Sequence, residues 1–268
     1  MNKFERKMKY FVLTVASIIS VFPLYWMAIS ATNKSADILA GKMIPGRFAL
    51  ENFRNLVNTY NIGKAMTNSI KYSVLMTLAS LIICSLAGYG FEIYHDKVKD
   101  KVMSILLLAL MVPFVAILIP LFQMMSKLEL LNTSLGFMLP TISTPFLIML
   151  FRQNTKAFPY EIVEAARIDG CSELKIFVKF FIPTMKSTFA AAIIITFMNA
   201  WNSYLWPKVI MQTDESITMP ILVASLKDGY FTDYGMLMLA VLLCTMPTVL
   251  FFFFLQKQFA EGIAGSVK

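Results

Sequence analysis

Tyr234–Gln256 reads YGMLMLAVLLCTMPTVLFFFFLQ, a run of 23 residues without Asp, Glu, Lys or Arg. A helix needs about 20 mostly apolar residues to cross the roughly 30 Å hydrocarbon core of a membrane, so this run is long enough to span it. Five more such runs lie upstream: Tyr10–Asn33, Tyr72–Phe91, Val102–Ser126, Leu130–Phe151 and Ser187–Pro207. One run alone could be a buried helix of a soluble protein. Six runs in 268 residues predict an all-α, polytopic membrane protein with six transmembrane helices.

The composition agrees with this class and excludes several others. Hydrophobic residues make up 57% and charged residues 15% of the chain, against about 45–50% and about 25% in soluble domains. Cys84, Cys171 and Cys244 form no CxxC pair, so we expect neither a disulfide framework nor a metal site. His95, the only histidine, lies in a charged stretch and is interpreted as a solvated loop residue. The chain has no GxxxxGK[ST] or GxGxxG motif, and hence no recognisable nucleotide site.

The basic residues cluster in alternate connections between the predicted spans. Fifteen of the 24 lie in the N-terminal segment 1–9, the connection 92–101, the loop 152–186 and the tail 257–268. Because cytoplasmic segments carry an excess of Lys and Arg, we expect both termini and the loop 152–186 in the cytoplasm. The loop 34–68 would then be extracytoplasmic, between a first helix at 10–33 and a core of five helices at 69–256. This placement of charge favours a membrane protein over a nucleic-acid-binding one.

The first apolar run begins after a basic segment, as a signal peptide does. It continues past the 7–15 residues of a typical signal-peptide core, and no clean small-residue cleavage site follows it. We therefore interpret it as an uncleaved first helix.

Polar and kinking residues inside the spans narrow the function. Prolines such as Pro113, Pro120 and Pro247 fit either simple bundle shape or irregular helices that line a path able to open and close. Carboxylates, lysines and histidines are absent from the middle of every predicted span. Proton-coupled carriers usually need such groups, and a membrane-embedded hydrolase needs a base beside its nucleophile. A secondary transporter and a membrane enzyme are therefore disfavoured.

The segment Ala157–Gly170 predicts a short helix inside the loop 152–186. Pro159 fits a first helical turn, where its missing N–H is harmless. Glu164 and the other early carboxylate, Glu161, suit the positive end of the helix dipole. Gly170 fits the left-handed position that ends a helix.

A second short helix is expected after this glycine, with Ser172 as its N-cap. Leu174, Phe177, Val178 and Phe181 follow an i, i+3, i+4, i+7 spacing and predict one apolar face. By this reasoning alone the loop is either an amphipathic segment at the membrane surface or a docking element for a soluble partner.

The same loop carries a motif of defined spacing. Glu164-Ala165-Ala166, then three residues, Gly170, then nine residues, and Phe180-Phe181-Ile182-Pro183 resemble the EAA signature of ABC importer permeases, EAA-x3-G-x9-I-x-L-P. The chain departs from the signature at Phe180 and Ile182, where it keeps apolar residues. We call the segment 152–186 the EAA loop.

The likeness covers nearly the whole chain and is greatest to the shorter permease subunit of the maltose-type sugar importers. The similar segments are Phe22–Met27, Ala87–Phe91, Ile119–Leu121, Leu130–Thr133, Ala166–Gly170, Trp201–Pro207 and Gln256–Gly262.

This resemblance implies the type I ABC importer permease fold and a transport subunit that is not itself an enzyme. The implied partners are a second permease subunit, an ATP-binding cassette ATPase dimer, an extracytoplasmic sugar-binding protein and membrane lipid. No cofactor would be held by this chain, since ATP would bind to the partner ATPase. The resemblance assigns contact with the ATPase to the following residues: Glu164, Ala165, Ala166, Asp169, Gly170 and Pro183.

Contact with the cargo is a separate expectation, which rests on residue types. Sugar sites pair aromatic faces with amides and hydroxyls, and such residues gather at the end of the fifth run: Asn199, Trp201, Asn202, Tyr204 and Trp206. An interfacial aromatic belt, with asparagines bonding between helices, is the alternative that these residue types favour. The function expected from the sequence is therefore a subunit of an ATP-driven oligosaccharide importer. The alternative is the same machinery carrying a polyol or glycerol phosphate.

Overall fold

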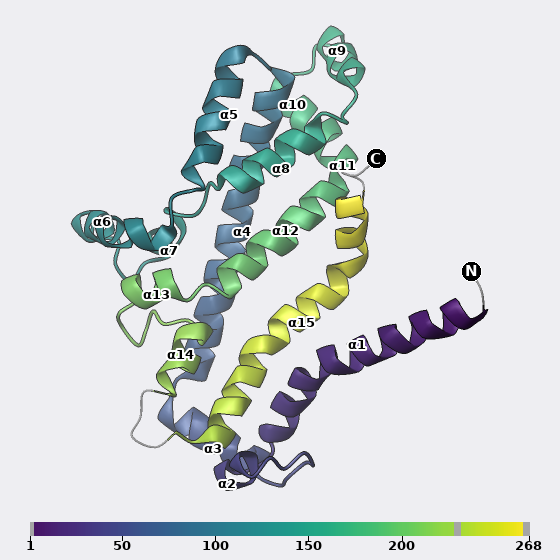
Figure 1. Cartoon of the computed structure of the whole chain (residues 1–268). Helices are drawn as coiled ribbons and strands as arrows, with labels where there is room; N and C mark the ends of the chain where they lie inside the picture. Colours follow the sequence, from purple (N-terminus) through teal and green to yellow (C-terminus); the bar gives the residue numbers. More distant parts are fainter. Residues whose placement is uncertain (1–2, 228–231, 265–268) are drawn as a thin grey trace. The chain divides into compact units, whose positions relative to one another are not determined.

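The computed structural model describes residues 3–227 and 232–264, with side chains for residues 4–227 and 232–254. Every regular element within these residues is helical, which confirms the predicted all-α class (Figure 1). The elements are α1 (Lys3–Ser30), α2 (Ser35–Leu39), α3 (Ala49–Thr59), α4 (Ile62–Ile93), α5 (Lys97–Ala109), α6 (Phe114–Lys127), α7 (Ser134–Met138), α8 (Pro145–Thr155), α9 (Tyr160–Ile168), α10 (Glu173–Ile176), the π-helix η1 (Phe177–Phe181), α11 (Ile182–Thr184), α12 (Lys186–Trp201), α13 (Leu205–Ile210), α14 (Met219–Ser225) and α15 (Tyr234–Ala264). The predicted tail, 257–268, lies outside the residues whose side chains are described.

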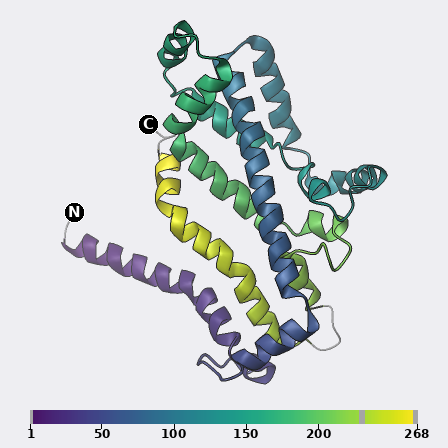
Figure 2. The same ribbon diagram turned by 180° about the vertical axis from the view of Figure 1, so that it is seen from behind.

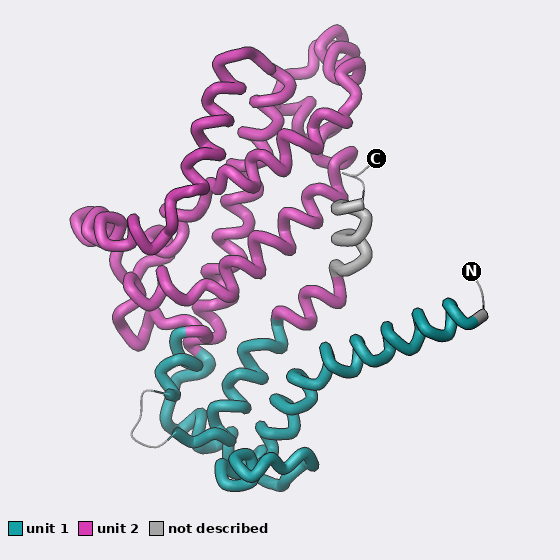
Figure 3. Tube along the Cα trace, viewed as in Figure 1, with its two compact units in different colours: residues 1–63, 221–247 teal, residues 64–220, 248–268 magenta. Residues whose placement is uncertain are grey.

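The chain divides into two compact units (Figure 3). Unit 1 comprises Met1–Gly63 and Ile221–Pro247, and unit 2 comprises Lys64–Pro220 and Thr248–Lys268. In unit 1 the buried Asn52 side chain donates hydrogen bonds to the carbonyls of Ala31, at 2.9 Å, and Asn33, at 3.0 Å. Gly235 lies against the same group, because a Cβ there would stand 2.6 Å from the Asn33 carbonyl oxygen. Asparagine hydrogen bonds therefore hold the irregular segment after α1.

Three described helices are long and apolar enough to cross a membrane: Phe4–Ser30, Ile62–Ile93 and Tyr234–Phe254. The number rises to five if each of two bent helix pairs counts as one span. The predicted count of six transmembrane helices stays a prediction.

The prolines explain where the predicted spans are broken. The third run is split into α5 and α6, which meet at 99°, and Pro113 is the N-cap of α6. The fourth run, expected as one helix, is not continuous and consists of the short helices α7 and α8. Pro145 begins α8 where its missing N–H costs nothing, and the Thr144 hydroxyl accepts a hydrogen bond from the Leu147 N–H at 3.3 Å. The sequence predicted kinks at these prolines, and the structure shows complete breaks in both runs.

The limits of two further runs also differ from the prediction. The second helix begins at Ile62, inside the loop expected at 34–68, and this loop also contains α2 and α3. The fifth run ends as a helix at Trp201 instead of Pro207, which lies within α13. A break at Met185 bends the chain by 84° at the start of α12.

Unit 2 is organised along α4, which runs through most of its length (Figure 2). Side chains from α4, α5, α8 and α12 share one buried cluster: Leu81, Cys84, Met103, Leu147, Ile148, Phe151 and Ala192. Gly88 lets α4 approach α8 closely, since a Cβ there would lie 2.5 Å from Phe151 Cβ and 2.8 Å from the Arg152 nitrogen. These contacts fix the helices that carry both regions described next.

Candidate functional site

The EAA loop contains two short helices joined at a glycine, as the sequence predicts. Pro159 is the N-cap of α9, one position before the first turn, and Ser172 is the N-cap of α10. Gly170 has φ +73°, a left-handed conformation that costs other residues about 1–2 kcal/mol. The chain can therefore reverse between α9 and α10 without strain.

The two helices rest on a closed apolar cluster, which we call the aromatic base. It consists of Tyr89, Phe158, Val163, Ala166, Ile176, Phe177, Phe181 and Met185. Phe181 is fully buried, and its ring centroid lies 4.9 Å from that of Tyr89 and 5.4 Å from that of Phe158. These rings meet edge to face, a geometry that adds to the energy of burial. The base therefore joins α9 and η1 to the end of α4.

The structure places most of the predicted ATPase-contact residues on the outer surface of the loop. Glu164, Ala165, Asp169, Gly170 and Pro183 are exposed, whereas Ala166 is buried in the aromatic base. The two alanines of the motif thus differ, because consecutive helical residues point about 100° apart. The small side chain of Ala166 lets α9 pack closely on the aromatic base. That of Ala165 leaves the exposed surface of α9 without a bulky group.

The predicted apolar face of the second helix is only half correct. Phe177 and Phe181 are buried, but Leu174 is 66% and Val178 is 52% exposed, and Ile176 is buried in their place. Val178 lies within η1, where hydrogen bonds from residue i to i+5 shift the register of the faces, whereas Leu174 lies before it, on α10. Two apolar side chains consequently remain on the exposed surface of the loop.

Polar contacts of Arg167 connect α9 to α10. Its Nε donates to Glu173 Oε1 at 2.7 Å, and its guanidinium also donates to the Tyr160 hydroxyl at 3.2 Å. The bond to Glu173 is the main reason that the pKa of Arg167 is raised above its usual value. This ion pair is exposed, so it orients the two helices more than it stabilises them.

Arg152 is a residue whose role the sequence did not indicate. It was counted only among the basic residues of the loop, but its side chain is 10% exposed. Its Nε lies 3.2 Å from Glu92 Oε2, and its guanidinium also pairs with Asp100. One buried cation therefore ties the end of α8 to the end of α4 and the start of α5.

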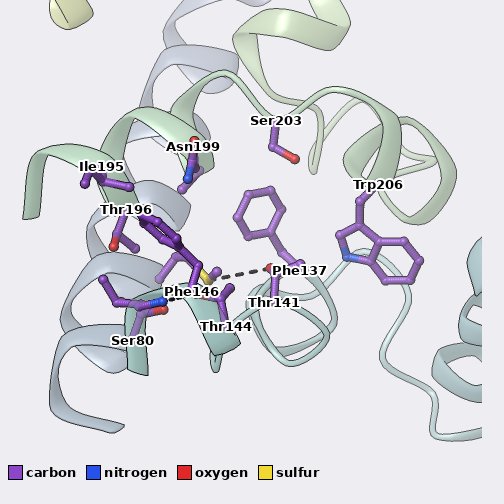
Figure 4. Close-up of a pocket in the computed structure, with 13 residues that line it drawn as sticks. Ser80, Phe137, Thr141, Thr144, Phe146, Ile195, Thr196, Asn199, Ser203 and Trp206 are labelled. Atoms are coloured by element: carbon purple, nitrogen blue, oxygen red, sulfur yellow. Dashed lines mark hydrogen bonds between the residues drawn. The ribbon is translucent and has the colours of Figure 1, made fainter. Parts of the chain in front are cut away.

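A pocket of about 220 Å³ lies among α4, α7, α8, α12 and α13 (Figure 4). Of the five residues named above for cargo contact, Asn199 and Trp206 line it. Trp201 is buried and stacks on Phe197 with ring centroids 5.9 Å apart. Asn202 and Tyr204 are exposed and outside the pocket. The end of the fifth run thus contributes one amide to the pocket.

The remaining polar groups of the pocket come from α4, from the segment before α8, and from α12 and the residues that follow it. They are the hydroxyls of Ser80, Thr141, Thr144, Thr196 and Ser203. The spacing of these serines and threonines in the sequence gave no signal that they converge. Trp206, named among the sugar-like residue types, does line the pocket. Within the described residues, no group of three or more His, Cys, Asp or Glu side chains is arranged to hold a metal ion.

Comparison with protein families gives one match over most of the chain. Residues 80–265 match the family described as binding-protein-dependent transport system inner membrane component. The chain belongs to this family. The matched residues include the EAA loop, the aromatic base and all of the pocket lining except Met76.

Related proteins of this transport family match over nearly the full length. The lactose transport system permease protein LacG of Rhizobium radiobacter is 42% identical over 97% of this chain and 95% of its own. The arabinooligosaccharides transport system permease protein AraQ of Halalkalibacterium halodurans is 33% identical, covering 94% and 92%. The sn-glycerol-3-phosphate transport system permease protein UgpE of Escherichia coli K12 is 29% identical, covering 96% and 95%.

One solved structure has the same fold. A chain in the crystal structure of a bacterial ABC transporter involved in the import of the acidic polysaccharide alginate superposes with a TM-score of 0.82. The superposition covers 96% of this chain and 98% of that one at 18% identity. The predicted resemblance to ABC importer permeases is confirmed, and the chain is a membrane transport component of an ABC system.

Proposed function

We propose that this chain is the transmembrane subunit of an ATP-driven, binding-protein-dependent importer of sugars, and that it receives its energy through the EAA loop. One observation carries the proposal. Residues of the EAA signature, including Glu164 and the left-handed Gly170, are exposed on helices that pack on the aromatic base. The central ring of this base, Phe181, is fully buried.

The aromatic base supports a coupling role because close-packed interiors have low compressibility and transmit displacement. A push on α9 reaches Phe181 through Val163 and Ala166, and then Tyr89 on α4. Arg152 adds a second, ionic connection to the same end of α4. Closure of an ATPase pair against α9 would thus move the helices that line the pocket.

The exposed surface of the loop supports a protein partner more than a lipid one. Glu164 on α9 and Asp169 at its C-cap offer exposed carboxylates, and Leu174 on α10 adds an exposed apolar side chain. An anionic membrane surface repels carboxylates, whereas arginine side chains in a cleft of an ATPase can form ion pairs with them. In this proposal both termini and the EAA loop are cytoplasmic, as the distribution of basic residues predicts.

The cargo class follows from the relatives' names and from the missing charges. LacG and AraQ, at 42% and 33% identity, are named for lactose and arabinooligosaccharides. UgpE, at 29%, is named for sn-glycerol-3-phosphate, an anion that favours basic groups along its path. The residues lining the pocket include no cation. We therefore favour a neutral saccharide over glycerol phosphate.

A pull-down from mild detergent tests the coupling role. Tagged wild type is compared with the double variant Glu164→Lys, Gly170→Pro and with Glu161→Lys, a matched charge reversal at another exposed position of α9. We expect wild type and Glu161→Lys to retain an ATPase and a second permease. The double variant should lose at least nine-tenths of the ATPase and keep the second permease.

Two results would contradict this proposal. One is recovery of the same partners with every variant, and the other is recovery of wild type alone. Uptake into cells provides an independent arm, in which lactose and an arabinooligosaccharide are supplied under ATP depletion or with an ionophore. Uptake that collapses with the ionophore while ATP is maintained would indicate a secondary transporter instead.

A further inference from the structure

The pocket of unit 2 is lined by polar groups that carry no charge. Five hydroxyls and one amide face it, from Ser80 on α4, Thr196 and Asn199 on α12, Ser203 after α12, and Thr141 and Thr144 before α8. Figure 4 shows these labelled side chains around one cavity. No Asp, Glu, Lys, Arg or His is among the lining residues. Such a lining offers hydrogen bonds to hydroxyl groups and nothing to neutralise an ion.

Ser80 shows that one of these groups awaits a partner. Ser80 is only 1% exposed, and its Oγ has no hydrogen-bond partner among the described residues. Buried polar atoms are nearly always paired with protein, ordered water or a ligand. The neighbouring Thr144 hydroxyl, by contrast, already accepts from the Leu147 N–H. A hydroxylated ligand in the pocket would satisfy Ser80.

Aromatic faces complete the lining and are held in place. Phe137 is buried and stacks on Tyr72 with centroids 5.1 Å apart. The indole N–H of Trp206 donates to the Gly136 carbonyl at 3.1 Å, which fixes the orientation of the ring. Phe146, 52% exposed, stands at the rim. Fixed rings offer apolar contact to the C–H face of a sugar at low entropic cost.

The volume sets the size of the ligand. At about 220 Å³ the pocket is smaller than the roughly 300–1,000 Å³ of sites for drug-sized ligands. We propose that it binds a single ring of a neutral saccharide, within this subunit itself, and that it excludes anionic cargo. The inference rests on the proposed function, because it assigns a cargo contact to a sugar importer.

An anionic ligand fits the same pocket poorly. Burying a phosphate or carboxylate without a paired cation costs several kcal/mol, and the lining provides no cation. Discrimination between lactose and glycerol 3-phosphate would thus arise from the absence of a cation in the pocket as well as from its hydroxyl and amide groups.

Uptake kinetics of the complete transporter, reconstituted with its second permease, ATPase and sugar-binding protein, test the inference. The probe is radiolabelled lactose, with arabinotriose in parallel and glycerol 3-phosphate as competitor. Ser203→Phe fills the pocket, and Asn202→Phe is its matched control, one residue away, exposed and outside the lining. Ser80→Ala removes the unpaired hydroxyl.

We expect Ser203→Phe to raise the KM for the transported saccharide at least tenfold, and Asn202→Phe to change it less than twofold. Ser80→Ala should raise KM about fivefold, the effect of one lost hydrogen bond. Maximal rates should stay unchanged, since the lost contact holds bound cargo. An excess of glycerol 3-phosphate should leave saccharide uptake unaffected.

The failures separate clearly. If wild type imports neither saccharide in response to ATP, the proposed function fails and the pocket assignment falls with it. If wild type imports a saccharide but Ser203→Phe behaves as Asn202→Phe, the pocket assignment alone is overturned. Loss of the second permease on purification of Ser203→Phe would show that a partner side chain fills the pocket. A lower maximal rate with an unchanged KM, or competition by glycerol 3-phosphate, would also overturn it.

Discussion

The aromatic base of the EAA loop and the pocket around Asn199 lie in the same unit but are built in opposite ways. The base consists of closely packed side chains that are apolar apart from the Tyr89 hydroxyl, and Phe181 at its centre is fully buried. The pocket keeps open space beside hydroxyls, and one of them, Ser80, is unpaired. Both regions take residues from α4 and from the chain that leads into or along α12.

This difference indicates a division of tasks within one helical frame. Tight packing makes one region move as a body, because closely packed side chains cannot absorb a displacement by compression. Open space lined by hydroxyls makes the other region ready to exchange water for a hydroxylated solute. Changes in the base should therefore affect stability, whereas changes in the pocket should affect affinity.

The largest expected effect is the loss of the ring at the centre of the base. Phe181→Ala removes a side chain with no exposed surface, which contacts the rings of Tyr89, Phe158 and Phe177. Truncations of this kind cost about 3–5 kcal/mol. Thermal unfolding of the purified protein in detergent should show a large fall in the melting temperature, and ATPase recovery should fall with it.

Two further Phe→Ala variants are controls for the loss of Phe181. Phe180→Ala alters the neighbouring ring, which is 37% exposed, and should cost less than about 1 kcal/mol. Phe146→Ala alters the rim of the pocket and should likewise leave the melting temperature nearly unchanged. Equal destabilisation by all three would mean that the two regions do not differ in packing.

Gly88 gives the second test, because it lies where α4 meets α8. The Cβ of Gly88→Ala would meet Phe151 Cβ at 2.5 Å and backbone atoms of Arg152 and Ile148 at 2.8 and 3.0 Å. Overpacking of this kind costs about 1–3 kcal/mol. Gly90→Ala is the control on the same helix, where an added Cβ meets nothing within 4 Å.

The control should change stability in the opposite direction. Alanine in a helix interior is favoured over glycine by about 0.5–1 kcal/mol, so Gly90→Ala should raise the melting temperature slightly. If Gly88→Ala is also neutral or stabilising, α4 and α8 are not as closely packed as the contact distances indicate.

Local rules were sufficient to predict the helices of the EAA loop. Pro159, Gly170 and Ser172 mark starts and stops through their own backbone chemistry, and the structure has helix ends at these positions. Uncharged length also identified the three long helices. The length of an uncharged run did not locate the helix breaks at Pro113 and in the fourth run, because hydropathy carries no information on backbone breaks.

The pocket was beyond sequence reasoning for a different reason. Ser80, Thr141 and Thr196 come from three segments, and only the packing of α4, α8 and α12 brings them together. Trp201 has the residue type of a sugar contact, yet its ring packs on Phe197. The exposed Val178 is a smaller case of the same limit, since the π-helix that contains it has no recognised sequence signal.

The smallest expected effect concerns the link between the two helices of the EAA loop, where the base ends and the exposed surface begins. Gly170→Ala places a Cβ in open space, but at φ +73°. The cost is therefore backbone strain alone, about 1–2 kcal/mol, and Gly170→Asn should recover part of it because asparagine tolerates this region. Since the strain can relax by fraying α10 without opening the aromatic base, the melting temperature should fall little. Recovery of the ATPase should fall further than stability does, in the order wild type, Asn, Ala. If the melting temperature and the recovery of the ATPase fall in proportion, the exposed surface of the loop cannot change independently of the base. The base and the exposed residues would then form one cooperative element.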